Sequence, residues 1–235
     1  MTEPARVAIV KSAGRADALA TAVRELSLVP VLVCPYRVEP RDNAHRDLCL
    51  ALTEPVAWFA VTSPHAALDV LSVFTTHSFK VAAVGHGTAS ALQALGFSVA
   101  LVGDSGAESL GAKMLAAGFT AGDVVVHACG EDARPELRHV IEAAGGVYVP
   151  VVVYRMVPDP VGERAAAGDF AAVVVGSPNL AHRAAQLFPA RPPAVAIGRT
   201  TAAALRDLGW PPAAVAARPT PQDVAAALAA ALGRG

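Results

Sequence analysis

Two short motifs place small hydroxyl side chains directly after apolar runs, where they could hold an anion. They read VTSPHAA and VGSPNLA, with serines at Ser63 and Ser177. Serine followed by proline after a strand is typical of a helix N-cap with proline at the first helical position. A plain cap is one interpretation. The other is that the open N–H groups of the helix start bind an acidic group, lined by Thr62, Ser63, Ser177 and Asn179.

A second pair of motifs, VAAVGHGTASAL and AVAIGRTTAAAL, looks like nucleotide-binding loops. The first imitates a dinucleotide fingerprint, because a glycine-rich turn joins an apolar run to a helical stretch. Its third glycine is replaced by Ser90, and the second copy lacks the middle glycine. The motifs therefore favour tight strand-to-helix turns at Gly85 and Gly198, with Thr88 and Thr201 near the helix starts and no nucleotide bound.

No other arrangement of reactive side chains stands out. The seven histidines show no metal-ligand spacing, and there is neither a GxSxG nucleophile elbow nor a P-loop. The net charge of −1 gives no electrostatic reason to expect nucleic acid as a partner. We expect no metal and no cofactor, so the chemistry must need little from side chains.

The elements that carry these motifs alternate between two kinds of segment. Ten short β-branched runs, from VAIV to AAVAA, are mostly continuous rather than alternating, which is typical of strands buried on both faces of a parallel sheet. Between them we expect helices at segments such as RADALATAVREL, PHAALDVLSVF, PELRHVIEAAG and PQDVAAALAAAL. The alternation predicts an α/β fold with roughly five strands in each half.

The two halves of the chain repeat each other. AWFAVTSPHAALDVLSVF and the following VAAVGHGTASALQALG align with AAVVVGSPNLAHRAAQLF and AVAIGRTTAAALRDLG. The offset between the serines of the Ser-Pro motifs matches the offset between Gly85 and Gly198 to within one residue. PVLVCPYRVEP also matches PVVVYRMVPDP, which pairs Tyr36 with Tyr154. The repeat predicts two similar domains.

Cysteine usage and the N-terminal segment indicate where the protein works. The three cysteines are widely spread and form no CxxC pair, which fits a reducing compartment. The start MTEPARVAIV lacks a basic flank followed by a long apolar run, and no apolar stretch reaches membrane-spanning length. We expect a cytoplasmic protein with no membrane association.

Taken in order, these motifs resemble the uroporphyrinogen-III synthase family, whose members close the linear tetrapyrrole hydroxymethylbilane. The matching pieces span nearly the whole chain: FAVTSPHAA, VAAVGHGTASAL, VVVYRMVPDP, VVVGSPNLA, AIGRTTAAAL and RPTPQDVAAAL. Two positions depart from the family pattern, because His65 replaces a common asparagine and Gly176 a common threonine. The resemblance implies a cofactor-independent lyase of tetrapyrrole biosynthesis that removes water and inverts ring D to give uroporphyrinogen III.

The resemblance also implies a particular domain organisation. It predicts two similar flavodoxin-like domains, each a parallel sheet flanked by helices, facing each other across a cleft. The chain would cross between them twice. Domain 1 would then contain residues 1–35 and 160–235, domain 2 residues 41–153, and a two-segment hinge residues 36–40 and 154–159.

The implied catalysis rests on orientation of the substrate. Loss of its hydroxyl leaves a reactive azafulvene that the far pyrrole ring attacks, so the protein must fold the chain and hold its carboxylates. Tyr154 matches the family tyrosine proposed to assist departure of the hydroxyl. The substrate would be bound by backbone N–H groups and by the side chains of Ser12, Arg15, Thr62, Ser63, His86, Thr88, Ser177, Asn179, Arg199, Thr200 and Thr201.

The implied partner is a small linear tetrapyrrole, delivered through transient contact with hydroxymethylbilane synthase to a monomeric protein. Two other classes of protein share the expected architecture. A tetrapyrrole-binding sensor of the same fold would bind without catalysis. A periplasmic-type binding protein would also have two lobes, but it would begin with a signal peptide.

Overall fold

The computed structural model describes residues 4–12, 17–53, 55–67, 71, 78–104 and 106–234. The chain divides into two compact units, the first made of Met1–Arg37 and Val157–Gly235 and the second of Val38–Met156. Both units contain a parallel sheet flanked by helices. This confirms the predicted α/β fold class.

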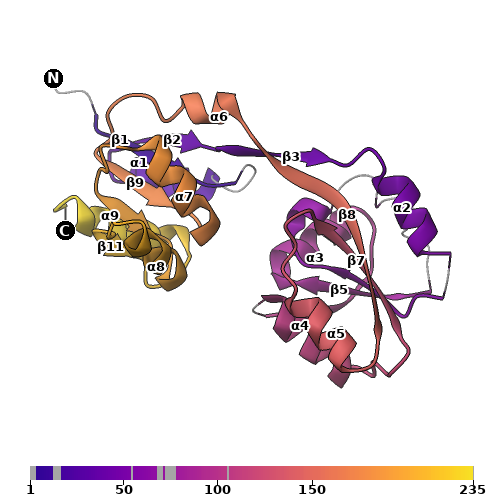
Figure 1. Ribbon diagram of the computed structural model, residues 1–235. Coiled ribbons are helices and arrows are strands. Elements are labelled where there is room, and N and C mark those ends of the chain that lie inside the picture. Colours follow the sequence, from indigo (N-terminus) through magenta and orange to yellow (C-terminus); the bar gives the residue numbers. More distant parts are fainter. Residues whose placement is uncertain are drawn as a thin grey trace. The chain divides into compact units, whose positions relative to one another are not determined.

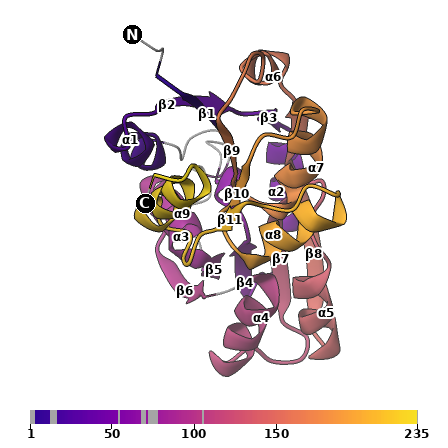
Figure 2. The ribbon, with the colours of Figure 1, turned by 90° about the vertical axis from the view of Figure 1, so that its left-hand side faces the viewer.

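The first unit is built around a parallel sheet of strand order β11-β10-β9-β1-β2. Its strands are β1 (Arg6–Val10), β2 (Val29–Val33), β9 (Ala172–Val175), β10 (Ala194–Ala196) and β11 (Ala214–Val215). Its helices are α1 (Asp17–Glu25), α6 (Pro160–Arg164), α7 (Pro178–Leu187), α8 (Arg199–Asp207) and α9 (Pro221–Ala231). Figure 2 shows α1 and α9 on one side of this sheet and α7 and α8 on the other.

The second unit contains the sheet of order β3-β8-β7-β4-β5-β6. Its strands are β3 (Tyr36–Pro40), β4 (Trp58–Val61), β5 (Lys80–Val84), β6 (Val99–Gly103), β7 (Val124–Gly130) and β8 (Val147–Pro158). Its helical elements are α2 (Ala44–Ala51), the 3-10 turn η1 (Pro64–Ala66), α3 (Gly85–Ala94), α4 (Gly106–Ala116) and α5 (Glu136–Ala143). In Figure 1, α4 and α5 lie side by side next to the strands of this unit.

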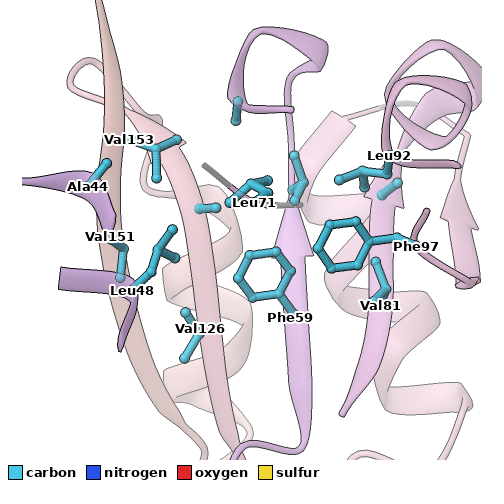
Figure 3. Packing of buried hydrophobic residues seen from close by; sticks show 14 of the residues in the cluster. Ala44, Leu48, Phe59, Leu71, Val81, Leu92, Phe97, Val126, Val151 and Val153 are labelled. Atoms are coloured by element: carbon cyan, nitrogen blue, oxygen red, sulfur yellow. The ribbon is translucent and has the colours of Figure 1, made fainter. Parts of the chain in front are cut away.

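Strand β4 shows why these runs read as continuous apolar segments, since all four of its residues are buried. Trp58 and Ala60 pack with α4 and α5 on one face, while Phe59 and Val61 pack with α2 and α3 on the other. Figure 3 shows Phe59 in the middle of this second layer, with the ring of Phe97 stacked 6.0 Å from it. A central strand covered on both faces needs apolar side chains at every position.

The two sheets have the same strand order if one of them is treated as a circular permutation of the other. In the first unit, β2-β1-β9-β10-β11 is the flavodoxin-like order 2-1-3-4-5. In the second unit, β8-β7-β4-β5-β6 gives the same order when β7 is counted as the first strand. The repeat found in the sequence, β4 with β9 and β5 with β10, follows this correspondence. In the first unit, β1 and β2 therefore occupy the positions that β7 and β8 occupy in the second unit.

Two segments that are distant in the sequence, β3 and β8, lie side by side at the end of the second sheet (Figure 1). Arg41 N donates to Val153 O at 3.0 Å, and Asp159 N donates to Pro35 O at 2.9 Å. The residue numbers rise along one segment as they fall along the other, so the two segments run in opposite directions.

One expected helix differs in the structure. PHAALDVLSVF was predicted to be helical, but its described beginning is a single 3-10 turn over Pro64–Ala66 that ends at Ala67. Residues 68–70 and 72–77 lie outside the described residues. Within the described part of the chain, no helix has the length and apolar character needed to cross a bilayer.

Candidate active site

The strand order of each sheet fixes where a ligand can bind. In open α/β sheets ligands bind at the carboxyl ends of the strands, where the strand order reverses. That point lies between β1 and β9 in the first unit and between β7 and β4 in the second. Ser12 and Ser177 follow the first pair of strands, and Thr62 and Ser63 follow β4. Four of the predicted residues thus lie at the switch points of their own units.

In the second unit, Ser63 organises the turn that leaves β4. It is the N-cap of η1, and its Oγ accepts a hydrogen bond from His65 N at 3.3 Å. The His65 ring meets the ring of Tyr154 edge-on, with centroids 6.0 Å apart. The Ser63 side chain also lies near enough to the Tyr154 phenol to lower its pKa. The structure therefore places Ser63 and Tyr154, two of the predicted site residues, near each other.

Tyr154 lies against the backbone of Gly130. A Cβ atom added at Gly130 would lie 2.6 Å from the Tyr154 Cζ atom and 2.8 Å from its hydroxyl, so only glycine leaves room for the ring there. A register shift between Cys129 and Gly130 brings the glycine opposite the tyrosine. Tyr154 is 8% exposed. Burial raises the pKa of its phenol, against the effect of the nearby Ser63 side chain, so the phenol is protonated at neutral pH and can donate.

Thr62, one residue before Ser63, is hydrogen bonded to a buried histidine that the sequence motifs did not point to. Its Oγ1 lies 2.9 Å from Nε2 of His127, and the other ring nitrogen of His127 lies 2.6 Å from the hydroxyl of Tyr148. The signal in the sequence was a histidine within the apolar run VVVHA. A search for metal-ligand spacing passes over such a residue, because its partners come from two other strands.

The first turn of α3 offers backbone donors at the same edge. The helix begins at Gly85, whose φ of +72° suits glycine, and no side chain caps it. His86 is exposed in this turn, whereas the side chain of Thr88 is buried at 3%. The open N–H groups and His86 can meet an anion, while the Thr88 hydroxyl points into packed protein.

In the first unit, two helices begin at the edge formed by β9 and β10. Ser177 is the N-cap of α7, but its side chain accepts no capping hydrogen bond. Helix α8 also lacks a side-chain cap. Gly198 before it is extended, with a φ of −177°, so the turn there does not require glycine as was expected. The two helices pack against each other, which places their N-terminal N–H groups at one edge of the sheet.

The side chains at this edge differ in their access to solvent. Asn179, Arg199 and Thr200 are exposed, and Ser12 and Ser177 are half-buried. Thr201 is 1% exposed and packs inside the unit. Arg15 lies outside the described residues. The edge therefore carries one described guanidinium, that of Arg199, beside several backbone donors.

The remaining residues that the sequence singled out have other surroundings. Tyr36 packs against the core of the first unit, whereas its repeat partner Tyr154 belongs to the core of the second. Asp104, the acid of the imitated dinucleotide fingerprint, is paired with Lys113 at 2.7 Å. Among the described residues, no three His, Cys, Asp or Glu side chains gather closely enough to hold a metal ion.

Comparisons with known proteins agree with this architecture. A mutant uroporphyrinogen III synthase from Thermus thermophilus has a similar solved structure, with a TM-score of 0.65, 22% identity and coverage of 98% of this chain and 100% of the other. For the uroporphyrinogen-III synthetase of Helicobacter pylori the TM-score is 0.64 at 17% identity, covering 97% of this chain and 99% of the other. These likenesses show the fold. The comparison with curated proteins gave no match.

The family model described as uroporphyrinogen-III synthase HemD matches residues 17–226, a range that includes both Ser-Pro motifs and both glycine-turn motifs, while β1 and Ser12 precede it. A match of that length extends over both units. It agrees with the motif order read from the sequence, and it shows that the chain belongs to the uroporphyrinogen-III synthase family.

Proposed function

We propose that this protein is a uroporphyrinogen-III synthase, a hydro-lyase that converts hydroxymethylbilane to uroporphyrinogen III with loss of water and inversion of ring D. The observation that supports the proposal most is the duplicated strand edge. Each unit carries a Ser-Pro motif beside its switch point and a helix start without a side-chain cap at the same edge of its sheet. A linear tetrapyrrole bears carboxylates along its length, so two anion-binding edges suit it better than one.

We propose that the helix starts bind these carboxylates. The first turns of α3, α7 and α8 have N–H groups that no capping side chain occupies, and each helix start carries a partial positive charge. The exposed His86 and Arg199 side chains add donors at the two edges. Thr201 would contribute through its backbone N–H, because its side chain is buried; Thr88 is the fourth residue of α3 and would act only by supporting the helix start.

Tyr154 is our candidate for the proton donor to the leaving hydroxyl. Its phenol is protonated at neutral pH, and its ring packs closely against the backbone of Gly130. In the proposed step the C–O bond breaks with electrons from the pyrrole nitrogen, and the hydroxyl leaves as water with the phenolic proton. Loss of the pyrrole N–H proton completes the azafulvene and restores the phenol.

The later steps need placement rather than further acid or base groups. The substituted carbon of the far ring attacks the azafulvene, and the spiro intermediate fragments and recloses with that ring inverted. The electrons come from the pyrroles themselves. We propose that the protein accelerates one closure by holding the carboxylates so that the reacting carbons meet.

We also propose a cytoplasmic location. Cys34, Cys49 and Cys129 are free thiols, which supports the reducing compartment expected from the sequence. A monomeric state and transient contact with hydroxymethylbilane synthase stay predictions.

A coupled assay tests the proposed function. Hydroxymethylbilane is unstable, so it would be generated from porphobilinogen by added deaminase, and the products would be oxidised and separated as type I and type III isomers. We expect type III product only when the protein is present. Type I product alone, at the level of the reaction without the protein, would overturn the proposal. Tight tetrapyrrole binding without type III product would instead indicate the sensor.

A further inference from the structure

A buried histidine connects the site to the interior of the second unit. His127 is 1% exposed, lies on β7, and uses both ring nitrogens: Nε2 lies 2.9 Å from Thr62 Oγ1 and Nδ1 lies 2.6 Å from the Tyr148 hydroxyl. Val125, its strand neighbour on the same face, packs with residues of α4 and α5. A polar ring in such surroundings is stable only when its hydrogen bonds are made.

The strand register explains how these three groups meet. His127 is opposite Ala60 on β4, and Tyr148 on β8 is opposite Val125. Side chains two residues apart on a strand share a face, so His127 shares one face with Val125 and Thr62 lies one step beyond Ala60 on that face. β4 and β7 are the two strands that flank the switch point. The imidazole thus contacts the hydroxyl at the end of β4 from inside the protein.

The direction of each hydrogen bond follows from the protonation of its members. Burial lowers the pKa of His127 to about 4 and raises that of Tyr148 to about 12, so at neutral pH the ring is neutral and the phenol keeps its proton. A neutral imidazole has one donor and one acceptor nitrogen. The phenol is the stronger acid of the two possible donors at the Nδ1 contact, and 2.6 Å is a length typical of O–H donors.

With Tyr148 donating to Nδ1, the proton of the ring is on Nε2, which donates to Thr62. A threonine oxygen that accepts this bond still has its own O–H to donate. In the opposite tautomer, Nδ1 would donate to the Tyr148 oxygen, and the Thr62 hydroxyl would donate its proton to Nε2 and have none left for a ligand.

We propose that His127 is a positioning residue that, fixed in one tautomer by Tyr148, keeps the Thr62 hydroxyl available as a hydrogen-bond donor to a substrate carboxylate. The proposal rests on the proposed function, because it names Thr62 as a contact of the tetrapyrrole. Thr62 is half-buried at the carboxyl end of β4, where ligands of such sheets bind. Neither His127 nor Tyr148 need touch the substrate for this role.

Tyr148→Phe is the sharpest variant, because it removes a hydroxyl that does not contact Thr62. We expect it to raise KM for enzymatically generated hydroxymethylbilane about fivefold, the effect of one hydrogen bond, with little change in kcat. Thr62→Val should have the same effect. The double variant should be no worse than Thr62→Val alone, because Tyr148 acts through that hydroxyl. Thr62→Ser should restore both the low KM and its sensitivity to Tyr148→Phe.

Two further measurements separate positioning from mere support of the fold. Val125→Ala would leave a cavity on the same strand and face as His127 without removing a hydrogen bond. It should therefore lower the melting temperature without raising KM. Long-range proton–nitrogen NMR of histidine-labelled protein should show His127 protonated at Nε2, with its signals identified by their loss in His127→Gln.

Each outcome decides between explanations. Independent, multiplying effects of Tyr148→Phe and Thr62→Val in an active protein would overturn this inference and leave the proposed function intact. So would an Nδ1-protonated ring, or an unchanged KM in Tyr148→Phe. Absence of type III product from the unmodified protein would overturn the proposed function, and the inference with it.

Discussion

At the scale of single residues, the site depends on groups held by close packing. Tyr154 lies against the backbone of Gly130, and the nearby Ser63 side chain lowers the pKa of its phenol. Its ring also belongs to the core of its unit. The proposed chemical role would therefore be combined with a packing role in one side chain, and removal of the hydroxyl alone separates the two.

We predict that Tyr154→Phe lowers kcat by up to about a hundredfold, the low end of what a general acid supplies, because the leaving hydroxyl departs easily. The melting temperature should change little, since the ring and its packing stay. Turnover in the coupled assay and thermal unfolding measure the two effects. Tyr36→Phe, at the matching position of the repeat, should have a smaller effect on kcat. Equal and negligible losses at both positions would make Tyr154 a packing residue.

The buried His127 also makes a prediction about acid stability. Its pKa is about 4 in the folded protein against 6.5 ordinarily, so between these pH values the unfolded chain binds a proton at this histidine and the folded chain does not. The contribution of His127 to the free energy of unfolding is complete above pH 6.5. It falls by about 3 kcal/mol as the pH falls toward 4. His127→Gln should reduce the fall of unfolding free energy across this range, as measured in urea. The same change at the exposed His139 should leave the fall intact, and an unaltered fall in His127→Gln would contradict the account.

The sequence predicted part of this residue-scale picture. Ser63 and Ser177 could be named because each lies in a motif with a local meaning, serine before proline after a strand, whereas Tyr154 was named from the family resemblance. His127 and Tyr148 could not, because their roles arise from pairing between strands distant in the chain. Thr88 and Thr201 were placed correctly at helix starts, but which face of the helix they occupy depends on packing.

At the scale of elements, helix starts separate into two groups. Thr220 caps α9 by accepting from Asp223 N at 3.2 Å and donating to its carboxylate at 2.7 Å. Ser177 occupies the same position of α7 without any capping bond from its side chain. A hydroxyl that caps supports its helix, whereas one that does not is available to a ligand.

We predict opposite effects for the two substitutions. Ser177→Ala should leave the unfolding free energy nearly unchanged and lower kcat/KM several-fold, the effect of one neutral hydrogen bond. Thr220→Ala should cost about 1 kcal/mol of stability and leave kcat/KM unchanged. Chemical unfolding and the coupled assay measure both. A loss of activity beyond about a thousandfold in a folded Ser177→Ala protein would instead mark Ser177 as a nucleophile or essential acid.

Most of the elements themselves could be read from the sequence. All ten apolar runs are strands, because continuous burial on both faces leaves a signal that needs no knowledge of the fold. PHAALDVLSVF has the apolar pattern of a helix, yet its described start is a 3-10 turn capped by Ser63. Periodicity alone does not distinguish a short 3-10 turn from the first turn of a longer helix.

At the scale of the whole molecule, the repeat and the strand orders describe one duplicated unit. One copy is continuous in the sequence, and the other is assembled from both ends of the chain. β1 and β2 correspond to β7 and β8, so the first unit needs both ends of the chain. A repeat of local motifs cannot show this by itself, since the pairing of β1 with β9 joins residues on either side of the second unit.

We predict that a fragment of residues 38–156 folds alone, because its core clusters lie within that range. It should unfold cooperatively in urea and show dispersed NMR signals. A fragment of residues 1–115, which contains β1 without β9, should not. Folding of 1–115 together with failure of 38–156 would indicate two contiguous domains and would contradict the proposed crossing.

The central claim is that this chain steers the tetrapyrrole toward one isomer. The most direct measurement is the ratio of type III to type I product as the protein is titrated into a fixed rate of hydroxymethylbilane synthesis. We predict that the type III share rises with protein concentration until type I is nearly absent, because enzymatic closure then outpaces the spontaneous reaction. A ratio that stays at the spontaneous value at every concentration would contradict the account.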